Sequence, residues 1–233
     1  MLKELRTCML VFTMLTWQTP NHAPVIRITQ PVNHSFGTWG TQIPYSVEVS
    51  DTEDGESKYQ EIQPAEVLVR LKYATNSTQA SAYLKQKKFE DTTGLMTMMI
   101  SNCLSCHGFK SKLSGPSFQD ICKKYSADPL SREQLQNHII TGSTGIWGKE
   151  VMPTHPELNA GIVQKMVQWI LTYANDPGLN YFVGLQGALP LNKPKANIQS
   201  GVFIVTAFYT DHGTADFPNG RMTGAGHSVI KMK

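Results

Sequence analysis

Two cysteines that are separated by two residues and followed directly by a histidine constrain this chain more than any other feature of its sequence. Cys103, Cys106 and His107 form this Cys-x-x-Cys-His pattern. The spacing lets one turn of backbone present both thiols to the two vinyl groups of a porphyrin. The imidazole next to the second cysteine can then bind the iron as the proximal ligand. The pattern therefore predicts one covalently attached haem c with iron, held by Cys103 and Cys106 and ligated by His107.

Three other interpretations of the pattern are a disulfide, a redox-active cysteine pair and half of a zinc site. A zinc site of this type needs a second pair of cysteine or histidine ligands, whereas the remaining cysteines, Cys8 and Cys122, lie far apart in the sequence. A thioredoxin-like cysteine pair needs a βαβ context, which the sequence around the motif does not show. Because three fixed letters can occur by chance, the haem prediction needs support from residues further along the chain.

A six-coordinate haem c needs a second axial ligand, and a methionine thioether is the usual one in electron carriers. Met152 lies in a predicted loop, between Val151 and Pro153, from which its sulfur could approach the iron on the face opposite the histidine. His138 and His155 are the rival ligands. We favour Met152, because a loop Met-Pro is the context expected for an axial methionine.

Hydrophobic periodicity divides the chain into β-rich and helical parts. Strands are predicted where apolar residues alternate or form short β-branched and aromatic runs, at residues 25–29, 44–50, 67–73, 201–209 and 228–230. Shorter helices are predicted at residues 94–100, 116–125 and 131–141, the last with the capping-box spacing of Ser131 and Gln134. The longest helix is predicted at residues 159–173, where apolar residues recur three and four positions apart.

These parts predict a multidomain protein with a small Ig-like β segment, a central all-α domain and a C-terminal β-rich segment that could be an incomplete sandwich. The expected boundaries are a leader or apolar N-terminal segment at 1–22, the Ig-like β domain at 23–75, a linker at 76–91, the all-α domain at 92–175 and the β-rich segment at 176–233. The first segment has the basic flank and apolar core of an export signal, but no clear cleavage site. An ordinary apolar segment of a longer protein is an equally good interpretation.

The helical part resembles a small bacterial class I cytochrome c of the respiratory carrier type. The resemblance covers residues 103–174. It rests on the cysteine–histidine motif and on four further pieces, which are Gly115-Pro116-Ser117-Phe118, residues 142–148, Val151-Met152-Pro153 and residues 167–171.

This resemblance implies roles for two more residues. The carbonyl of Pro116 would orient the ring of the proximal histidine, and Trp147 would lie against the haem and hydrogen-bond a propionate. It also implies that the helix carrying Trp169 crosses the helix carrying Gly94. The chain departs from the family pattern after Pro153, and it adds Cys122, which we expect to be a buried thiol.

The first β part is similar to PKD-type and related Ig-like repeats of secreted bacterial proteins, through residues 23–26, 47–51 and 53–55. In some of these proteins a PKD-like repeat and a cytochrome c domain accompany a sugar-dehydrogenase-like propeller, and residues 207–213 resemble their β-sandwich end. The resemblance implies a sugar-dehydrogenase-like domain or subunit as a partner. The acidic turn at 51–56 lacks the full spacing of a calcium loop, so we favour a solvated hairpin and assign no metal there.

Composition narrows the functional classes. A hydrophobic content of 40% and a charged content of 17% describe a globular protein. The net charge of +3 gives no reason to expect a nucleic-acid partner, and no apolar stretch has the length of a transmembrane span. Five lysines near the motif either steer an acidic redox partner or form an ordinary solvated surface, namely Lys110, Lys112, Lys123, Lys124 and Lys149.

We therefore expect one-electron transfer through haem c with His107 and Met152 as axial ligands, between a protein redox donor and a protein acceptor. An extracytoplasmic dehydrogenase is the expected source of the electrons. The chain would be a non-enzymatic carrier, or the haem module of a dehydrogenase, with no catalytic residue of its own. We expect a periplasmic or extracellular bacterial location, because haem is attached covalently outside the bacterial cytoplasm. The alternatives are a haem enzyme or sensor with a labile Met152, and a carbohydrate- or surface-binding module that carries a haem domain.

Overall fold

The computed structural model describes residues 20–85, 93–215 and 220–233. The strands are β1 (Val25–Gln30), β2 (Ser35–Gly37), β3 (Gln42–Asp51), β4 (Gly55–Glu56), β5 (Leu68–Ala74), β6 (Leu179–Val183), β7 (Gln186–Pro190), β8 (Val202–Thr210) and β9 (Thr223–Met232). The helices are α1 (Ser77–Lys85), α2 (Thr93–Ile100), α3 (Phe118–Lys124), α4 (Pro129–Thr141) and α5 (Ala160–Tyr173), with short 3-10 turns η1 (Ser57–Tyr59), η2 (Pro64–Glu66) and η3 (Cys103–Ser105).

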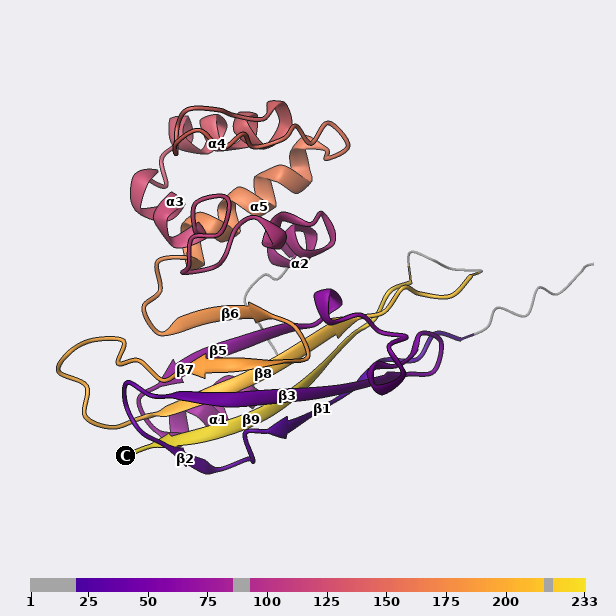
Figure 1. Cartoon of the computed structure of the whole chain (residues 1–233), viewed down its shortest axis with the longest axis vertical. Coiled ribbons are helices and arrows are strands. Elements are labelled where there is room, and N and C mark those ends of the chain that lie inside the picture. Colours follow the sequence, from indigo (N-terminus) through magenta and orange to yellow (C-terminus); the bar gives the residue numbers. More distant parts are fainter. Residues whose placement is uncertain (1–19, 86–92, 216–219) are drawn as a thin grey trace, which may run out of the picture.

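The strands form two sheets that pack as a sandwich (Figure 1). One sheet has the order β1-β3-β4, with β7 also paired to β3, and the other has the order β2-β9-β8-β5-β6. Both sheets contain strands from before and from after the helices, because β3 pairs with β7 and β5 lies between β6 and β8. The two sheets are therefore built jointly from the two ends of the chain.

Strand β8 is apolar at nearly every position, and both of its faces are buried. Its side chains alternate between the two faces of the sheet. Phe203, Val205, Ala207 and Tyr209 belong to the core between the sheets. Val202, Ile204 and Phe208 belong to two clusters on the opposite face, which helices cover. Because both faces are covered, β8 is apolar apart from its two threonines, Thr206 and Thr210.

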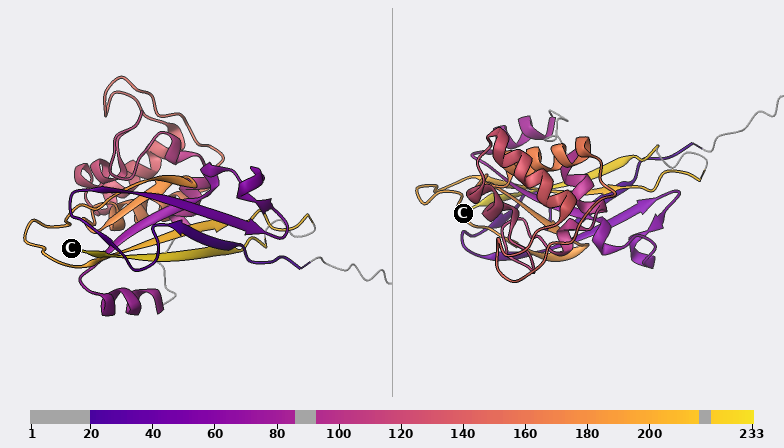
Figure 2. Two further views of the ribbon diagram at one scale, coloured as in Figure 1. Left: turned by 60° about the horizontal axis from the view of Figure 1, so that its bottom comes forward. Right: turned by 90° about the horizontal axis from the view of Figure 1, so that it is seen from above.

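The helices pack on that outer face. Leu68, Leu179, Tyr181 and Phe208 of the sheet share one hydrophobic cluster with α2, α3, α4 and α5. Helix α1 covers a separate patch through Ala80 and lies apart from the other helices (Figure 2). Helices α2 and α5 cross where Gly94 lies against the backbone of Lys165, so the crossing implied by the sequence resemblance is present.

The predicted fold class is wrong. The expectation was a small Ig-like segment, a central all-α domain and a separate β-rich tail, whereas the described residues form a mixed fold of five helices and nine strands in two sheets. The physical reason is that neither β part can complete a sheet alone: β5 needs β6 and β8 as neighbours. The helices do not form a free-standing all-α domain either, since their core includes residues of β5, β6 and β8.

Parts of four expected segments lie outside the described residues. These are residues 1–19 of the expected leader, which include Cys8, residues 86–91 of the expected linker, residue 92 of the expected all-α domain and residues 216–219 of the expected β-rich segment. The first part of that linker forms α1. In the described part of the chain, no helix is long and apolar enough to cross a membrane.

The acidic turn at 51–56 is tied into the sandwich. One oxygen of Asp54 accepts hydrogen bonds from the Tyr209 hydroxyl at 2.6 Å and from the His212 backbone N–H at 2.9 Å. The His212 ring lies 3.1 Å from the same oxygen and 2.7 Å from Glu66. Partial burial disfavours the charged ring, but the bonds and charges of Asp54 and Glu66 outweigh it, so that the pKa of His212 is raised. Asp54 therefore joins the turn to the end of β8.

We expect the His212→Gln substitution to lower the unfolding free energy by an amount that depends on pH. Because the pKa of His212 is raised in the folded state, the protonated ring stabilises that state. This stabilisation is complete when the pH is below the usual histidine pKa of about 6.5, and it is lost as the pH rises through the raised pKa. The difference in unfolding free energy between wild type and His212→Gln should therefore be largest near pH 5.5, at about 1 kcal/mol or less for so exposed a pair. Urea unfolding of both proteins between pH 5.5 and 9 measures it. A difference that does not change with pH would contradict the assignment.

Candidate functional site

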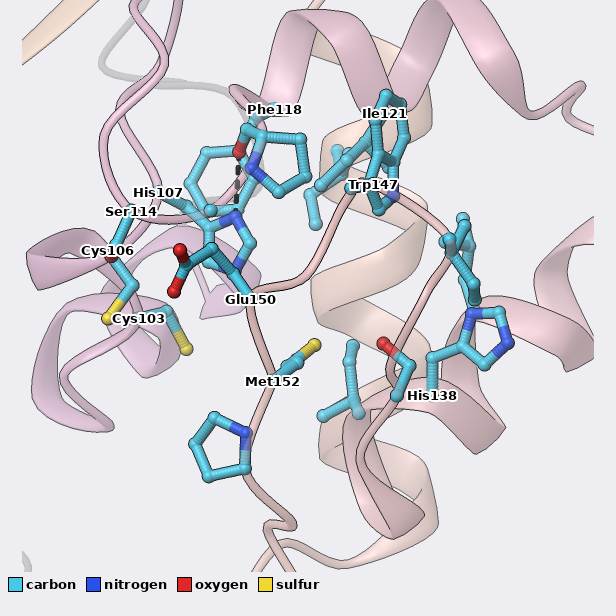
Figure 3. A pocket seen from close by; sticks show the side chains of 18 of the residues that line it. Cys103, Cys106, His107, Ser114, Phe118, Ile121, His138, Trp147, Glu150 and Met152 are labelled. Carbon is cyan, nitrogen blue, oxygen red and sulfur yellow. Dashed lines mark hydrogen bonds between the residues drawn. The ribbon is translucent and has the colours of Figure 1, made fainter.

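A pocket of about 1110 Å³, measured out to its open mouth, lies among the helices. All six residues predicted from sequence line it: Cys103, Cys106, His107, Pro116, Trp147 and Met152. Figure 3 shows the two cysteines and His107 reaching the pocket from one segment of the chain and Met152 from another. The fold thus brings together residues that are far apart in the sequence.

His107 is held in one orientation by three neighbours. Its Nδ1 lies 2.7 Å from the carbonyl oxygen of Pro116, drawn as a dashed line in Figure 3. Its ring stacks on Phe118 with centroids 5.5 Å apart and planes inclined by 15°. Gly115 lies so close that an added Cβ would be 2.6 Å from the ring carbon Cε1.

The bond to Pro116 also fixes which nitrogen is available. A carbonyl only accepts, so Nδ1 must carry the proton and donate, and the neutral ring keeps its free lone pair on Nε2. Burial lowers the pKa of His107, and the hydrogen bond to Pro116 works in the opposite direction. The histidine is therefore prepared to bind a metal through Nε2.

The two cysteines differ in their surroundings. Cys103 begins η3, and its carbonyl accepts hydrogen bonds from the N–H groups of Cys106 at 3.2 Å and His107 at 2.9 Å. Burial raises the pKa of Cys103 to about 11. Cys106 is exposed, and hydrogen bonds from Ser114 and Ser105 lower its pKa. Both are free thiols in the described structure, so the disulfide interpretation of the motif is not supported.

Met152 lies in the loop between α4 and α5. Its backbone pairs with Ser143, through N–H to carbonyl bonds of 3.2 Å and 2.9 Å. Gly142 adopts a φ of 76°, and an added Cβ there would be 2.7 Å from the Met152 carbonyl oxygen. This closed loop base directs the sulfur into the pocket (Figure 3).

The rival ligands are placed differently. The ring of His155 is paired with Glu157 at 2.8 Å, and His155 is absent from the pocket lining, which belongs wholly to the described residues. His138 does line the pocket, with its ring 6.4 Å from that of Tyr125. Cys122, expected to be a buried thiol, is half-buried, and its Sγ lies 3.6 Å from the Leu171 carbonyl oxygen.

The chemistry of the pocket suits a covalently held haem. Most of the wall is apolar, formed by Met98, Phe118, Ile121, Leu135, Ile139, Met166, Val167 and Ile170. The lining includes the imidazole of His107, the thioether of Met152 and the thiols of Cys103 and Cys106, which together are the set that a haem c with histidine and methionine ligands requires; His138, Met98 and Met166 also line the pocket. The residues present therefore fit the group.

Sequence reasoning missed the two residues that hold the histidine ring from its sides. The sequence marked Gly115 as part of a matching segment, and Phe118 as part of that segment and of the apolar cover of the haem, but it did not reveal their contacts with the histidine ring. The signal that could have identified Gly115 was its position directly before the proline whose carbonyl accepts from the ring, where close backbone approach requires a glycine. The role of Phe118 needs the folded geometry, because α3 turns its first residue back onto the ring.

The known proteins to which this chain is similar include bacterial cytochromes c-551 and c-552. No model of a known protein family matches the chain. It is 31% identical to cytochrome c-551 of Allochromatium vinosum over 71 residues, which cover 30% of this chain and 76% of that protein. It is 33% identical to cytochrome c-551 of Azotobacter vinelandii over 81 residues, covering 35% of this chain and 98% of that protein. The crystal structure of Nitrosomonas europaea cytochrome c552 matches with 32% identity and a TM-score of 0.31, over 32% of this chain and 93% of that one.

We expect Gly115→Ala to displace the ring of His107 and weaken its bond to Pro116. The new methyl group would lie inside contact distance of three ring atoms, and such crowding costs about 1–3 kcal/mol. Urea unfolding should show this loss, and histidine NMR should show a changed Nδ1–H signal. Gly161→Ala in α5 is the control: an added Cβ there meets its nearest atom only at 3.5 Å, and alanine is the better helix former by about 1 kcal/mol. Equal stability of Gly115→Ala and wild type would show that the ring is not confined in this way.

Proposed function

This chain belongs to the class I c-type cytochrome family over about a third of its length, and from this premise we propose that it transfers single electrons between protein partners. Its cofactor is a covalently attached haem c with iron. When bound, this group supplies an iron that takes up or releases one electron as it changes between the ferric and ferrous states.

Specific residues are proposed to hold the haem. Cys103 and Cys106 would form the two thioether links, and His107 and Met152 would be the axial ligands through Nε2 and sulfur. Pro116 would keep the histidine ring in place by accepting from Nδ1, which also raises the basicity of the ring. Trp147 would lie against the haem at the mouth of the pocket. The observation that carries the proposal is the bond from His107 to Pro116, because it leaves Nε2 free to face a pocket that also holds a thioether and two thiols.

With both axial positions taken by side chains, the iron would have no open position for a substrate. This favours electron transfer over catalysis at the iron. A thioether ligand stabilises the reduced iron relative to a second histidine, and apolar surroundings such as Phe118 and Ile121 act in the same direction. We therefore propose a comparatively high reduction potential.

The partners are proposed from chemistry. A protein donor and a protein acceptor would exchange electrons with the haem, and the donor would be an extracytoplasmic dehydrogenase. This class is suggested by the sequence likeness of residues 23–26, 47–51 and 53–55 to repeats of secreted bacterial proteins. The corresponding location is the periplasm or the outside of a bacterial cell. We propose that residues 92–175 form the haem-binding region of the chain.

Removal of both thiols tests covalent attachment. In the Cys103→Ala/Cys106→Ala double variant, haem should become extractable with acidified acetone, because no thioether link remains. The denatured wild-type protein should keep its haem. Cys122→Ala is the matched control, since Cys122 is also a free cysteine but lies outside the pocket lining, and it should behave like wild type. Haem that stays attached in the double variant would refute the proposed links.

The Met152→Ala variant tests the axial ligand. The ferric wild-type protein should show the weak absorption band of sulfur bound to iron, and the variant should lose it completely. The ferrous variant should also bind carbon monoxide rapidly, because one axial position is open. Met222→Ala is the control, since Met222 is 39% exposed and lies outside the pocket lining. Absence of the band in the intact protein would show that Met152 is not the ligand. Rapid carbon monoxide binding by that intact protein would then favour a haem sensor or enzyme.

A further inference from the structure

Helix α3 connects the two sides of the pocket. It begins directly after Ser117, which is fully buried and caps the helix by accepting from the Asp120 N–H at 3.0 Å. Its first residue, Phe118, stacks on His107. Its first amides are tied to the histidine segment, because Phe118 N–H donates to the Gly108 carbonyl at 3.0 Å and Gln119 N–H to the Phe109 carbonyl at 3.0 Å. The start of α3 is therefore fixed to the His107 side.

The end of α3 contacts the other side through Lys124, its last residue. The ammonium group of Lys124 lies 4.5 Å from the centre of the Trp147 ring. It also donates a hydrogen bond of 3.3 Å to the carbonyl of Ile146. Trp147 lines the pocket and Lys124 does not, so the lysine holds the indole without itself reaching into the haem space. Both contacts fall on adjacent residues of the loop that leads to Met152.

This loop has a firm base, and its tip packs Trp147 against the helical core. The base is closed by the backbone pairing of Ser143 with Met152. The tip consists of Ile146 and Trp147 and is flanked by Gly145 and Gly148, whose φ angles are 79° and 123°. An added Cβ on either of these glycines would meet nothing closer than 4 Å. The glycines therefore give the tip freedom to move, and neighbouring backbone does not restrict it there.

We propose that Lys124 is a positioning residue that clamps the loop tip over the pocket and thereby keeps Met152 bound to the iron. The clamp combines a cation–π contact with a charge-assisted hydrogen bond. It acts through Trp147 and the loop rather than by touching the haem. The inference rests on the proposed function in one respect, namely that Met152 is the axial ligand.

The next residue along the helix provides a matched control. Lys123 is also exposed on α3, but its ammonium group turns back to its own helix, at 3.3 Å from Gln119 and 3.7 Å from Asp120. Lys123→Gln and Lys124→Gln remove the same charge from neighbouring positions of one helix. Only the second removes a contact to the loop. Lys124→Arg keeps both a cation for the indole and a donor for the carbonyl.

The experiment compares wild type, Lys124→Gln, Lys124→Arg and Lys123→Gln, each with haem bound. The first measurement is the rate of carbon monoxide binding to the ferrous protein, which requires Met152 to leave the iron. We expect Lys124→Gln to bind about fivefold faster than wild type, the factor that corresponds to an exposed cation–π contact. Lys124→Arg and Lys123→Gln should stay close to wild type. The second measurement is hydrogen exchange at the Trp147 backbone amide, which should be faster in Lys124→Gln alone.

The possible results separate the two proposals. If Lys124→Gln and Lys123→Gln bind carbon monoxide at the same rate and exchange alike at Trp147, the clamp is overturned. If the intact protein lacks the sulfur–iron band, Met152 ligation fails, and with it the stated consequence of the clamp for the ligand. The exchange measurement would then still decide whether Lys124 holds the loop, since it does not depend on the iron ligand.

Discussion

The hydrogen bond from the Tyr73 N–H to the Gly178 carbonyl, 2.7 Å long, joins the two ends of the helical insertion. Tyr73 is near the end of β5 and Gly178 directly precedes β6, so the chain leaves and re-enters the sheet at neighbouring positions. An ion pair between Lys72 and Asp176, at 2.9 Å, reinforces the same point. Because the two ends are fixed side by side, about a hundred residues can be inserted between β5 and β6 without breaking the sheet. The helices then return onto its outer face, where Leu68 and Phe208 are part of their core.

The elements were largely predictable from sequence, whereas their assembly was not. Strands expected at 25–29, 44–50 and 67–73 are confirmed by β1, β3 and β5, because alternation of side chains is a local property. The helix expected at 159–173 is confirmed by α5. What the sequence could not reveal is that Leu68 pairs with both Val183 and Phe208. Pairing between such distant residues leaves no periodic signal, and without it the two β parts look like two incomplete domains.

In the candidate site, too, the residues were predictable from the sequence, whereas the contacts between them were not. Cys103, Cys106 and His107 lie within one short turn, so their spacing pointed to them directly, with support from the matching segments further along the chain. Met152 was selected from a loop pattern and lines the same pocket, although its role stays a prediction. The contacts that orient these groups depend on the fold, because they join segments that the sequence separates. The stacking of Phe118 on His107 and the reach of Lys124 to Trp147 both require α3 to lie between the two loops.

The two sides of the pocket are supported unequally. On the histidine side, Phe109 follows two residues after His107, is almost fully buried, and packs its ring against Trp169 at 5.8 Å and Tyr181 at 5.1 Å. Tyr181 belongs to β6, so this side of the pocket rests on the sandwich itself. On the methionine side, both glycines that flank the loop tip are exposed to solvent, and the tip is held by Lys124 at the end of α3 and by the packing of Trp147 against the helical core. Because a packed core yields less than an exposed loop, any opening of the site should begin at the methionine loop while the histidine stays in place. The sandwich would then hold the histidine ligand of the haem more rigidly than the methionine ligand.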